Sequence, residues 1–104
     1  MTGNNARTLD IPSETEPYPK TKLEKAALEY TNFKNANLER TNLKNAYLSD
    51  ANLDGASLEG ANLYHAQLYN ASLVKTNFKN ANLPEARFDG ANIDGANSEG
   101  AKLS

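Results

Sequence analysis

The chain lacks several residue types on which catalysis and metal binding commonly depend. Its 104 residues contain no cysteine, no tryptophan and a single histidine, His65. The absence of cysteine excludes disulfides and thiolate metal sites, and one histidine leaves a single candidate base for a catalytic triad. No apolar run is long enough for a signal peptide or a membrane-spanning helix, so the sequence predicts a cytoplasmic protein without a membrane segment.

The chain also has no large excess of positive or negative charge. Eleven basic residues face 13 acidic ones, which gives a net charge of −2. This balance argues against direct binding of nucleic acid and against a strongly acidic tail. The glycines do not form a phosphate-binding loop, and the nine-residue period of calcium-binding repeats is absent. The sequence therefore predicts a protein that is not an enzyme and that has no metal site and no cofactor.

A five-residue repeat is what the sequence does contain, and it runs from Thr21 to the end. In the unit ANLDG (51–55), position one is Ala, position three is Leu and position five is Gly. Sixteen of the seventeen third positions are large and apolar, Ser98 being the exception, and every first position is Ala or Thr. A five-residue step turns an α-helix by about 140° and would scatter these side chains around it. On a continuous strand the same step would alternate them between opposite faces.

A bend in every unit resolves this conflict and predicts an all-β coil. Positions one and three then point inward, position two points outward, and positions four and five make the turn. Ten of the sixteen fifth positions are Asn, Asp or Gly, which tolerate the positive φ that a type II turn requires, and Pro84 occupies a fourth position, where its fixed φ suits the turn. The predicted core residues are Leu38, Leu43, Leu48, Leu53, Leu58, Leu63, Leu68, Leu73, Phe78, Leu83 and Phe88.

The units ANLER, TNLKN, ANLDG, ASLEG and ANLYH resemble the A(D/N)LXX consensus of the pentapeptide-repeat family. The resemblance covers residues 21–104 without a break in register. It implies a right-handed quadrilateral β-helix with four units per coil, and the chain length then gives about four coils.

Residues 1–20 have a different composition and form a separate segment. Pro12, Pro17 and Pro19 prevent a continuous helix or strand there. Two interpretations stay open for this segment. It is a flexible leader, or it is a cap that places Leu9, Ile11 or Tyr18 over the first coil of the β-helix at 21–104.

Two recurrent polar residues favour a structural interpretation over a ligand-binding one. Asparagine recurs at position two, where its amide can bond to the backbone or to a stacked neighbour. These residues are Asn32, Asn37, Asn42, Asn52, Asn62, Asn77 and Asn82. Threonine occupies four first positions, and we expect each hydroxyl to find a backbone partner in the core. These are Thr21, Thr31, Thr41 and Thr76.

The placement of tyrosine gives the only candidate binding surface. With twenty residues per coil, units 26–30, 46–50 and 66–70 stack in one column, and all four tyrosines of the repeat region gather on that side. The candidate partner-binding residues are Tyr30, Tyr47, Tyr64, His65, Gln67, Tyr69 and Arg87. Tyrosine and arginine anchor many protein interfaces. The alternative is that these tyrosines only cover a sheet surface, on which they pack well.

These features predict a non-enzymatic interaction or scaffold module whose β-helix face meets an unknown protein partner. The resemblance also implies a second function, because some family members mimic DNA and bind DNA gyrase. Against it, the repeat region has 9 basic and 10 acidic residues and so lacks a phosphate-like field. In several family members the last coil mediates dimerisation, so the resemblance also implies a homodimer through the C-terminal coil.

Overall fold

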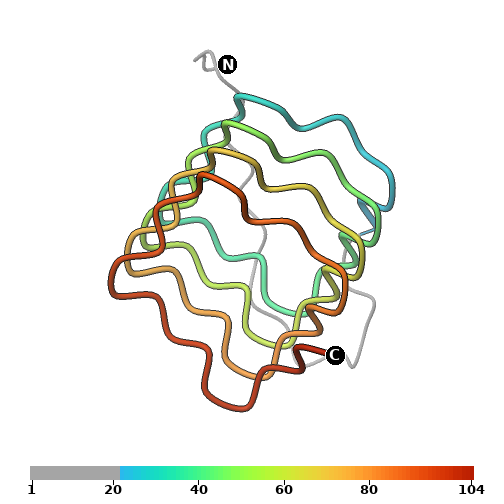
Figure 1. The fold of residues 1–104 in the computed structure, drawn as a ribbon, viewed down its shortest axis with the longest axis vertical. Helices are drawn as coiled ribbons and strands as arrows, with labels where there is room; N and C mark the ends of the chain where they lie inside the picture. The colour runs from blue at the N-terminus through green and yellow to red at the C-terminus, as the bar shows by residue number, and fades with distance from the viewer. Residues whose placement is uncertain (1–21) are drawn as a thin grey trace.

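The computed structural model describes residues 22–104, which wind into a solenoid of stacked coils (Figure 1). Residues 1–20, for which the sequence leaves a leader and a cap open, lie outside the described residues. Within 22–104 there is no helix and no strand longer than one bridged residue. The regular structure consists of parallel bridges at position two of the units and of turns at positions four and five.

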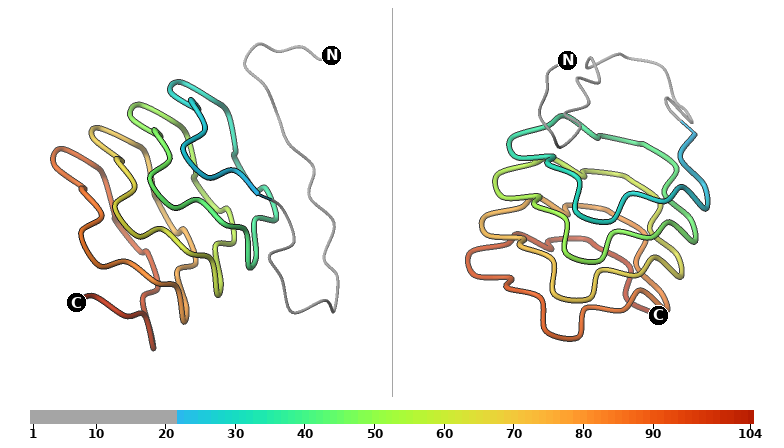
Figure 2. Two further views of the ribbon diagram at one scale, coloured as in Figure 1. Left: turned by 90° about the vertical axis from the view of Figure 1, so that its right-hand side faces the viewer. Right: turned by 90° about the horizontal axis from the view of Figure 1, so that it is seen from above.

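The register of the solenoid follows from the bridges, which always join residues 20 apart. Lys22 pairs with Asn42, Asn42 with Asn62 and Asn62 with Asn82. One coil therefore contains four units, and Figure 2 shows the coils lying one behind the other. In this register the coils span residues 22–40, 41–60, 61–80 and 81–100, and residues 101–104 continue beyond the last of them.

Backbone hydrogen bonds join adjacent coils through three N–H groups of each unit between residues 46 and 80. The N–H of Leu58 at position three donates to the carbonyl of Asn77 at 2.7 Å, and the N–H of Gly60 at position five donates to Lys79 at 2.9 Å. In return, the N–H of Asn77 at position two donates to Ala56 at 2.9 Å. Nearly all backbone groups of an inner coil are satisfied in this way, as a buried backbone requires.

Every unit ends in a tight turn, whatever residue stands at its fifth position. The N–H of the next first position donates to the carbonyl of position three, as from Ala61 to Leu58 at 2.9 Å. All sixteen fifth positions have a positive φ, as the turn type predicted from sequence requires. Six of them are residues that seldom adopt it, namely Lys25, Tyr30, Arg40, His65, Lys75 and Glu85. The stacking of coils therefore imposes the turn even where the local sequence does not favour it.

Leucine and alanine from positions three and one fill the interior. Of the predicted core residues, those from Leu38 to Leu83 are buried, and most have no exposed surface. Phe88 is only partly buried and packs edge-on against Phe78 with ring centroids 6.0 Å apart. Ile93 in the last coil and Leu103 just beyond it are 55% and 67% exposed. The core is thus continuous along the solenoid but open at its C-terminal end.

The asparagines at position two serve the backbone, as the sequence predicts. Asn52 Oδ1 accepts a hydrogen bond from the N–H of Asp54 at 3.0 Å, and seven other asparagines at position two make the same two-residue turn. Asn82 differs because the residue two places on is Pro84, which has no N–H. Its Nδ2 instead donates to Asn62 Oδ1 on the neighbouring coil at 2.9 Å.

Thr31, Thr41 and Thr76 are buried, whereas Thr21 lies outside the described residues, and the buried hydroxyls do not all behave as expected. Thr76 Oγ1 donates to the carbonyl of Leu53 at 2.7 Å. The hydroxyl of Thr41 is equally buried and has no partner in the described part of the chain, so the expectation of a backbone partner is wrong for Thr41. An unpaired buried hydroxyl destabilises the fold, by about 1–3 kcal/mol in general.

Acidic residues at position four bind the next coil. Asp54 accepts hydrogen bonds from Ser72 Oγ at 2.6 Å and from the N–H of Val74 at 2.9 Å. Glu39 accepts one from Ser57 Oγ at 3.2 Å. Both carboxylates lie on faces away from the tyrosines. Their hydrogen bonds hold adjacent coils together, so they have a structural role.

Candidate functional site

The site is built on one side of the solenoid, which we call the tyrosine face and define as units 26–30, 46–50, 66–70 and 86–90. Its central ladder joins Ala27 to Tyr47, Tyr47 to Gln67 and Gln67 to Arg87 through parallel bridges. These are position-two residues, so their side chains point outward from a rigid backbone. Neighbouring side chains in such a ladder are about 4.8 Å apart, close enough for one ligand to touch several of them.

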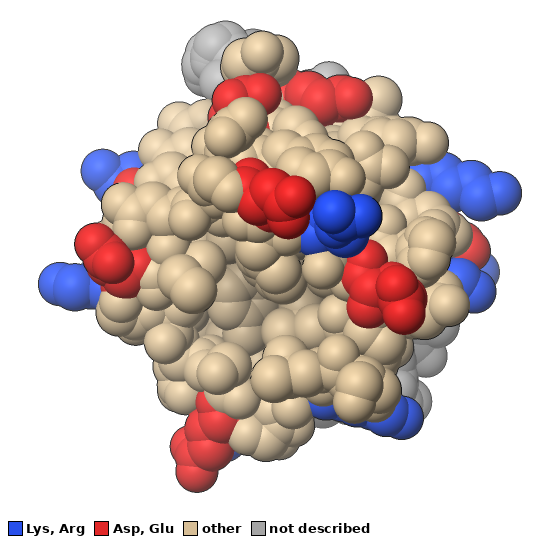
Figure 3. Space-filling view, in the orientation of Figure 1, with Lys and Arg blue, Asp and Glu red and all other residues tan. Residues whose placement is uncertain are grey.

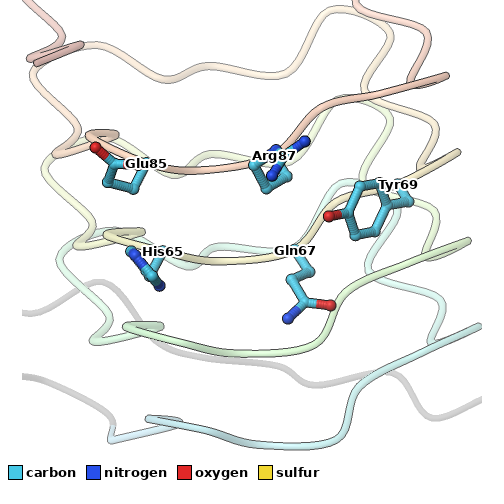
Figure 4. A pocket seen from close by; sticks show the side chains of 5 residues that line it. All are labelled: His65, Gln67, Tyr69, Glu85 and Arg87. Atoms are coloured by element: carbon cyan, nitrogen blue, oxygen red, sulfur yellow. The ribbon is translucent and has the colours of Figure 1, made fainter.

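A shallow hollow of about 160 Å³ lies on this face between two coils. Gln67 and Arg87 lie one above the other in it, with His65 and Glu85 on one side and Tyr69 on the other (Figure 4). His65 and Glu85 are fifth-position residues of successive coils, and the N–H of His65 donates to the carbonyl of Pro84 at 3.1 Å. The hollow therefore has a fixed backbone frame and a mixed polar lining.

Arg87 is held by an aromatic ring and a carboxylate of its own face. Its guanidinium carbon lies 5.8 Å from the centre of the Tyr69 ring. Its Nη2 lies 3.4 Å from Asp89 Oδ2, and both side chains are more than half exposed. An exposed pair of this kind contributes little to stability, but it shows that a cation fits between a ring and a carboxylate on this surface.

The corner that leads into the tyrosine face is aromatic as well. The rings of Tyr64 and His65 stack with centroids 5.0 Å apart. Lys44 Nζ lies 5.8 Å from the centre of the Tyr64 ring. Tyr64 is therefore in contact with the ammonium group of Lys44, as Tyr69 is with the guanidinium group of Arg87.

The structure places most of the predicted site residues at or next to the hollow and leaves Tyr30 apart from it. His65, Gln67, Tyr69 and Arg87 line the hollow, and Tyr64 stacks on His65. Tyr47 is next to Gln67 in the ladder, whereas Tyr30 lies in the first described coil, away from the hollow, and is 74% exposed. The candidate residues thus share one side of the molecule but do not form a single cavity.

Sequence reasoning missed three residues of this region, which are Lys44, Glu85 and Asp89. Glu85 follows His65 by one coil length, so the twenty-residue period is a signal that points to it. Lys44 and Asp89 take part through side-chain contacts to Tyr64 and Arg87. The repeat pattern contains no signal for such contacts, because they depend on side-chain rotamers.

The described part of the chain offers no metal-binding group at this site. Among residues 22–104 no group of three or more His, Cys, Asp or Glu side chains is placed to hold a metal ion. His65 is an exposed turn residue whose ring stacks on Tyr64. The face presents aromatic rings, amide groups and charges of both signs.

On the side of the molecule shown in Figure 3, basic and acidic residues occur singly or in small groups, and no broad field of one sign appears. On the tyrosine face the only basic residue is Arg87, against the acidic residues Glu29, Asp50 and Asp89. This face therefore has a small negative charge.

A second hollow, of about 270 Å³, opens at the C-terminal end of the core. Its lining is mostly apolar and consists of Phe78, Leu83, Phe88, Ile93, Ala96, Ser98 and Leu103. Ser98, the one polar third position, stands where a leucine would otherwise fill the coil. The N–H groups of Phe88 and Ile93 have no hydrogen-bond partner among the described residues, whereas their counterparts one coil earlier bond to the last coil.

Comparison with known proteins identifies the family of the repeat region. A family model described as a pentapeptide repeat region matches residues 20–104. A search of curated proteins finds no match. In residues 22–104 no helix is long and apolar enough to cross a membrane.

Solved structures of pentapeptide repeat proteins are similar to the chain. The protein alr5209 of Nostoc PCC 7120 is 29% identical with a TM-score of 0.73, and the match covers 80% of this chain and 84% of that one. Rfr23 of Cyanothece 51142 is 31% identical with a TM-score of 0.46, over 86% of this chain and 64% of that one. A thylakoid-lumen protein of Arabidopsis thaliana is 26% identical with a TM-score of 0.44, over 78% and 70%.

Proposed function

Because the chain belongs to the pentapeptide-repeat family, we propose that it is a non-enzymatic interaction module that binds a protein partner through its tyrosine face. We take its solenoid to be a right-handed quadrilateral β-helix of about four coils, as the family resemblance implies. The proposal extends to a cytoplasmic location and to the absence of a cofactor.

One observation supports this function above the others. All four tyrosines of the repeat region lie on or beside one face, together with Arg87 and a hollow between two coils. Exposed aromatic residues lose little conformational entropy on binding and bury a large area, so clusters of them mark interfaces. The rigid backbone frame below them reduces the entropic cost of binding further.

We expect the double variant Tyr47→Ala/Tyr64→Ala to lose its partner and keep its fold. Both side chains are partly exposed, at 40% and 37%, so their removal leaves the core intact. The measurement is capture of cross-linked partners by tagged protein expressed in its own organism, with circular dichroism to verify the fold. The matched control is Lys79→Ala/Glu99→Ala, two position-four side chains on the opposite side of the coil. Unchanged capture by the tyrosine variant would refute the proposal.

We also propose that the open C-terminal hollow allows the chain to form a homodimer. An apolar hollow beside the exposed side chains of Ile93 and Leu103 is a surface that a second copy would bury. Light scattering over a wide range of concentration should then give twice the monomer mass. Ile93→Glu should return the mass to that of the monomer, because it would place a charge in the interface. A wild-type mass that stays monomeric at high concentration would contradict the dimer.

A further inference from the structure

The tyrosine face contains the same chemistry twice, once with a cation in place and once without. In the half formed by units 66–70 and 86–90, the Arg87 guanidinium lies beside the Tyr69 ring and the Asp89 carboxylate. In the half formed by units 26–30 and 46–50, the rings are Tyr30 and Tyr47 and the carboxylates are Glu29 and Asp50. No lysine or arginine occurs in these two units.

The rings in this second half have no lysine or arginine of residues 22–104 against their faces. Tyr64 and Tyr69 each have one from the chain, Lys44 and Arg87, both at 5.8 Å from the ring centre. Tyr30 and Tyr47 have no such contact within residues 22–104, and they are the most exposed tyrosines, at 74% and 40%. Aromatic faces attract guanidinium and ammonium groups electrostatically. The two vacant rings are therefore accessible to a cation from outside.

The carboxylates in this half have no ion pair with any residue from 22 to 104. Neither Glu29 nor Asp50 forms an ion pair with a residue that the structure describes, whereas Asp89 pairs with Arg87. Tyr30 and Asp50 are fifth-position residues of successive coils, so their backbones are about 4.8 Å apart. Glu29 precedes Tyr30, so Glu29 and Asp50 belong to the same corner of two adjacent coils.

The local backbone leaves room for such an approach. Tyr47 pairs across the bridge with Ala27, whose side chain is a single methyl group. Most other position-two neighbours in the solenoid are larger polar residues, as Gln67 is on the other side of Tyr47. The side of Tyr47 that faces Glu29 and Tyr30 is therefore the less crowded one.

We propose that Glu29, Tyr30, Tyr47 and Asp50 form a binding site for a basic segment of the partner, with an arginine or lysine side chain placed between the rings and the carboxylates. This inference rests on the proposed function and specifies the chemistry of the partner. Arginine is the better match of the two, because its planar guanidinium stacks on a ring and pairs with a carboxylate at once, as Arg87 does.

Fluorescence anisotropy with synthetic peptides tests the site directly. The probes are labelled peptides of alternating arginine and glycine, lysine and glycine, and glutamate and glycine. We expect the arginine peptide to bind most tightly and the glutamate peptide not to bind. Glu29→Gln/Asp50→Asn and Tyr30→Leu/Tyr47→Leu should each weaken binding of the arginine peptide by about tenfold, since each removes two of the four contacts.

The matched control is Asp94→Asn/Glu99→Gln, which removes the same charge from other faces and should leave affinity within about twofold. An equal loss in this control, or equal binding of the glutamate peptide, would overturn the inference by showing an effect of net charge or no selectivity. Failure of every peptide to bind would also overturn it. The proposed function would survive that result if capture of the partner still depends on Tyr47 and Tyr64.

Discussion

Replacing Leu63 by lysine is expected to unfold the solenoid over several coils. Leu63 has no exposed surface and lies in the middle coils, with Leu43 and Leu83 at the corresponding positions one coil to either side. An unpaired charge in such a place costs several kcal/mol, which is comparable with the total stability of about 5–15 kcal/mol of a small domain. Each coil supports its neighbours, so the damage spreads along the stack.

Circular dichroism and thermal unfolding of soluble protein measure this effect. Leu63→Ala, which removes volume without adding charge, should cost about 2–5 kcal/mol and stay folded at low temperature. Gln67→Lys is the control, because position two points outward and already contains lysine in Lys22 and Lys102. A folded and soluble Leu63→Lys protein would show that position three is not the interior position and would refute the register.

Gly55→Ala is expected to cause a large loss of stability without any change in the core. Gly55 has a φ of +71°, and a Cβ built there would overlap Oδ1 of Asn35 on the preceding coil. Alanine in this conformation costs about 1–2 kcal/mol by itself, and displacement of the Asn35 carboxamide adds to it. We expect a total of about 2–4 kcal/mol.

Gly60→Ala separates these two contributions. Gly60 has a similar φ of +69°, but its added Cβ would meet only the flexible Cγ of Arg40, at 3.2 Å. Thermal or denaturant unfolding should therefore show a smaller loss for Gly60→Ala than for Gly55→Ala. In an Asn35→Gly background the cost of Gly55→Ala should fall to that of Gly60→Ala. Equal losses at both glycines in the wild-type background would contradict the overlap with Asn35.

The fold was predictable to the level of single positions because the period of five is incompatible with a plain helix or strand. Inward Ala and Leu, outward Asn and a turn with positive φ at position five all follow from that period, and the structure has each of them. Glu85 and Lys75 show where local preference fails, since neither favours a positive φ and both adopt it. The unpaired hydroxyl of Thr41 was not predictable, because its partner would have to come from another coil.

For the candidate site, the sequence predicts which residues stack in one ladder but not which side chains contact each other. A twenty-residue coil, which the family resemblance implied, places Tyr47, Gln67 and Arg87 in one ladder, and the bridges join them in that order. Which rings receive a cation was beyond the sequence, because Lys44 and Arg87 reach Tyr64 and Tyr69 by the conformations of long side chains. These side-chain conformations determine which half of the tyrosine face has a cation from residues 22–104 beside its rings and which half has none.

The most direct test of the account is site-specific photo-cross-linking in cells of the protein's own organism. A benzophenone amino acid at position 47, on the tyrosine face, is compared with one at position 57, which is also a position-two residue but lies on the opposite side of the coil. The account predicts a covalent adduct with another protein from position 47 and none from position 57. Adducts from position 57 alone, or equal adducts from both positions, would contradict a partner on the tyrosine face.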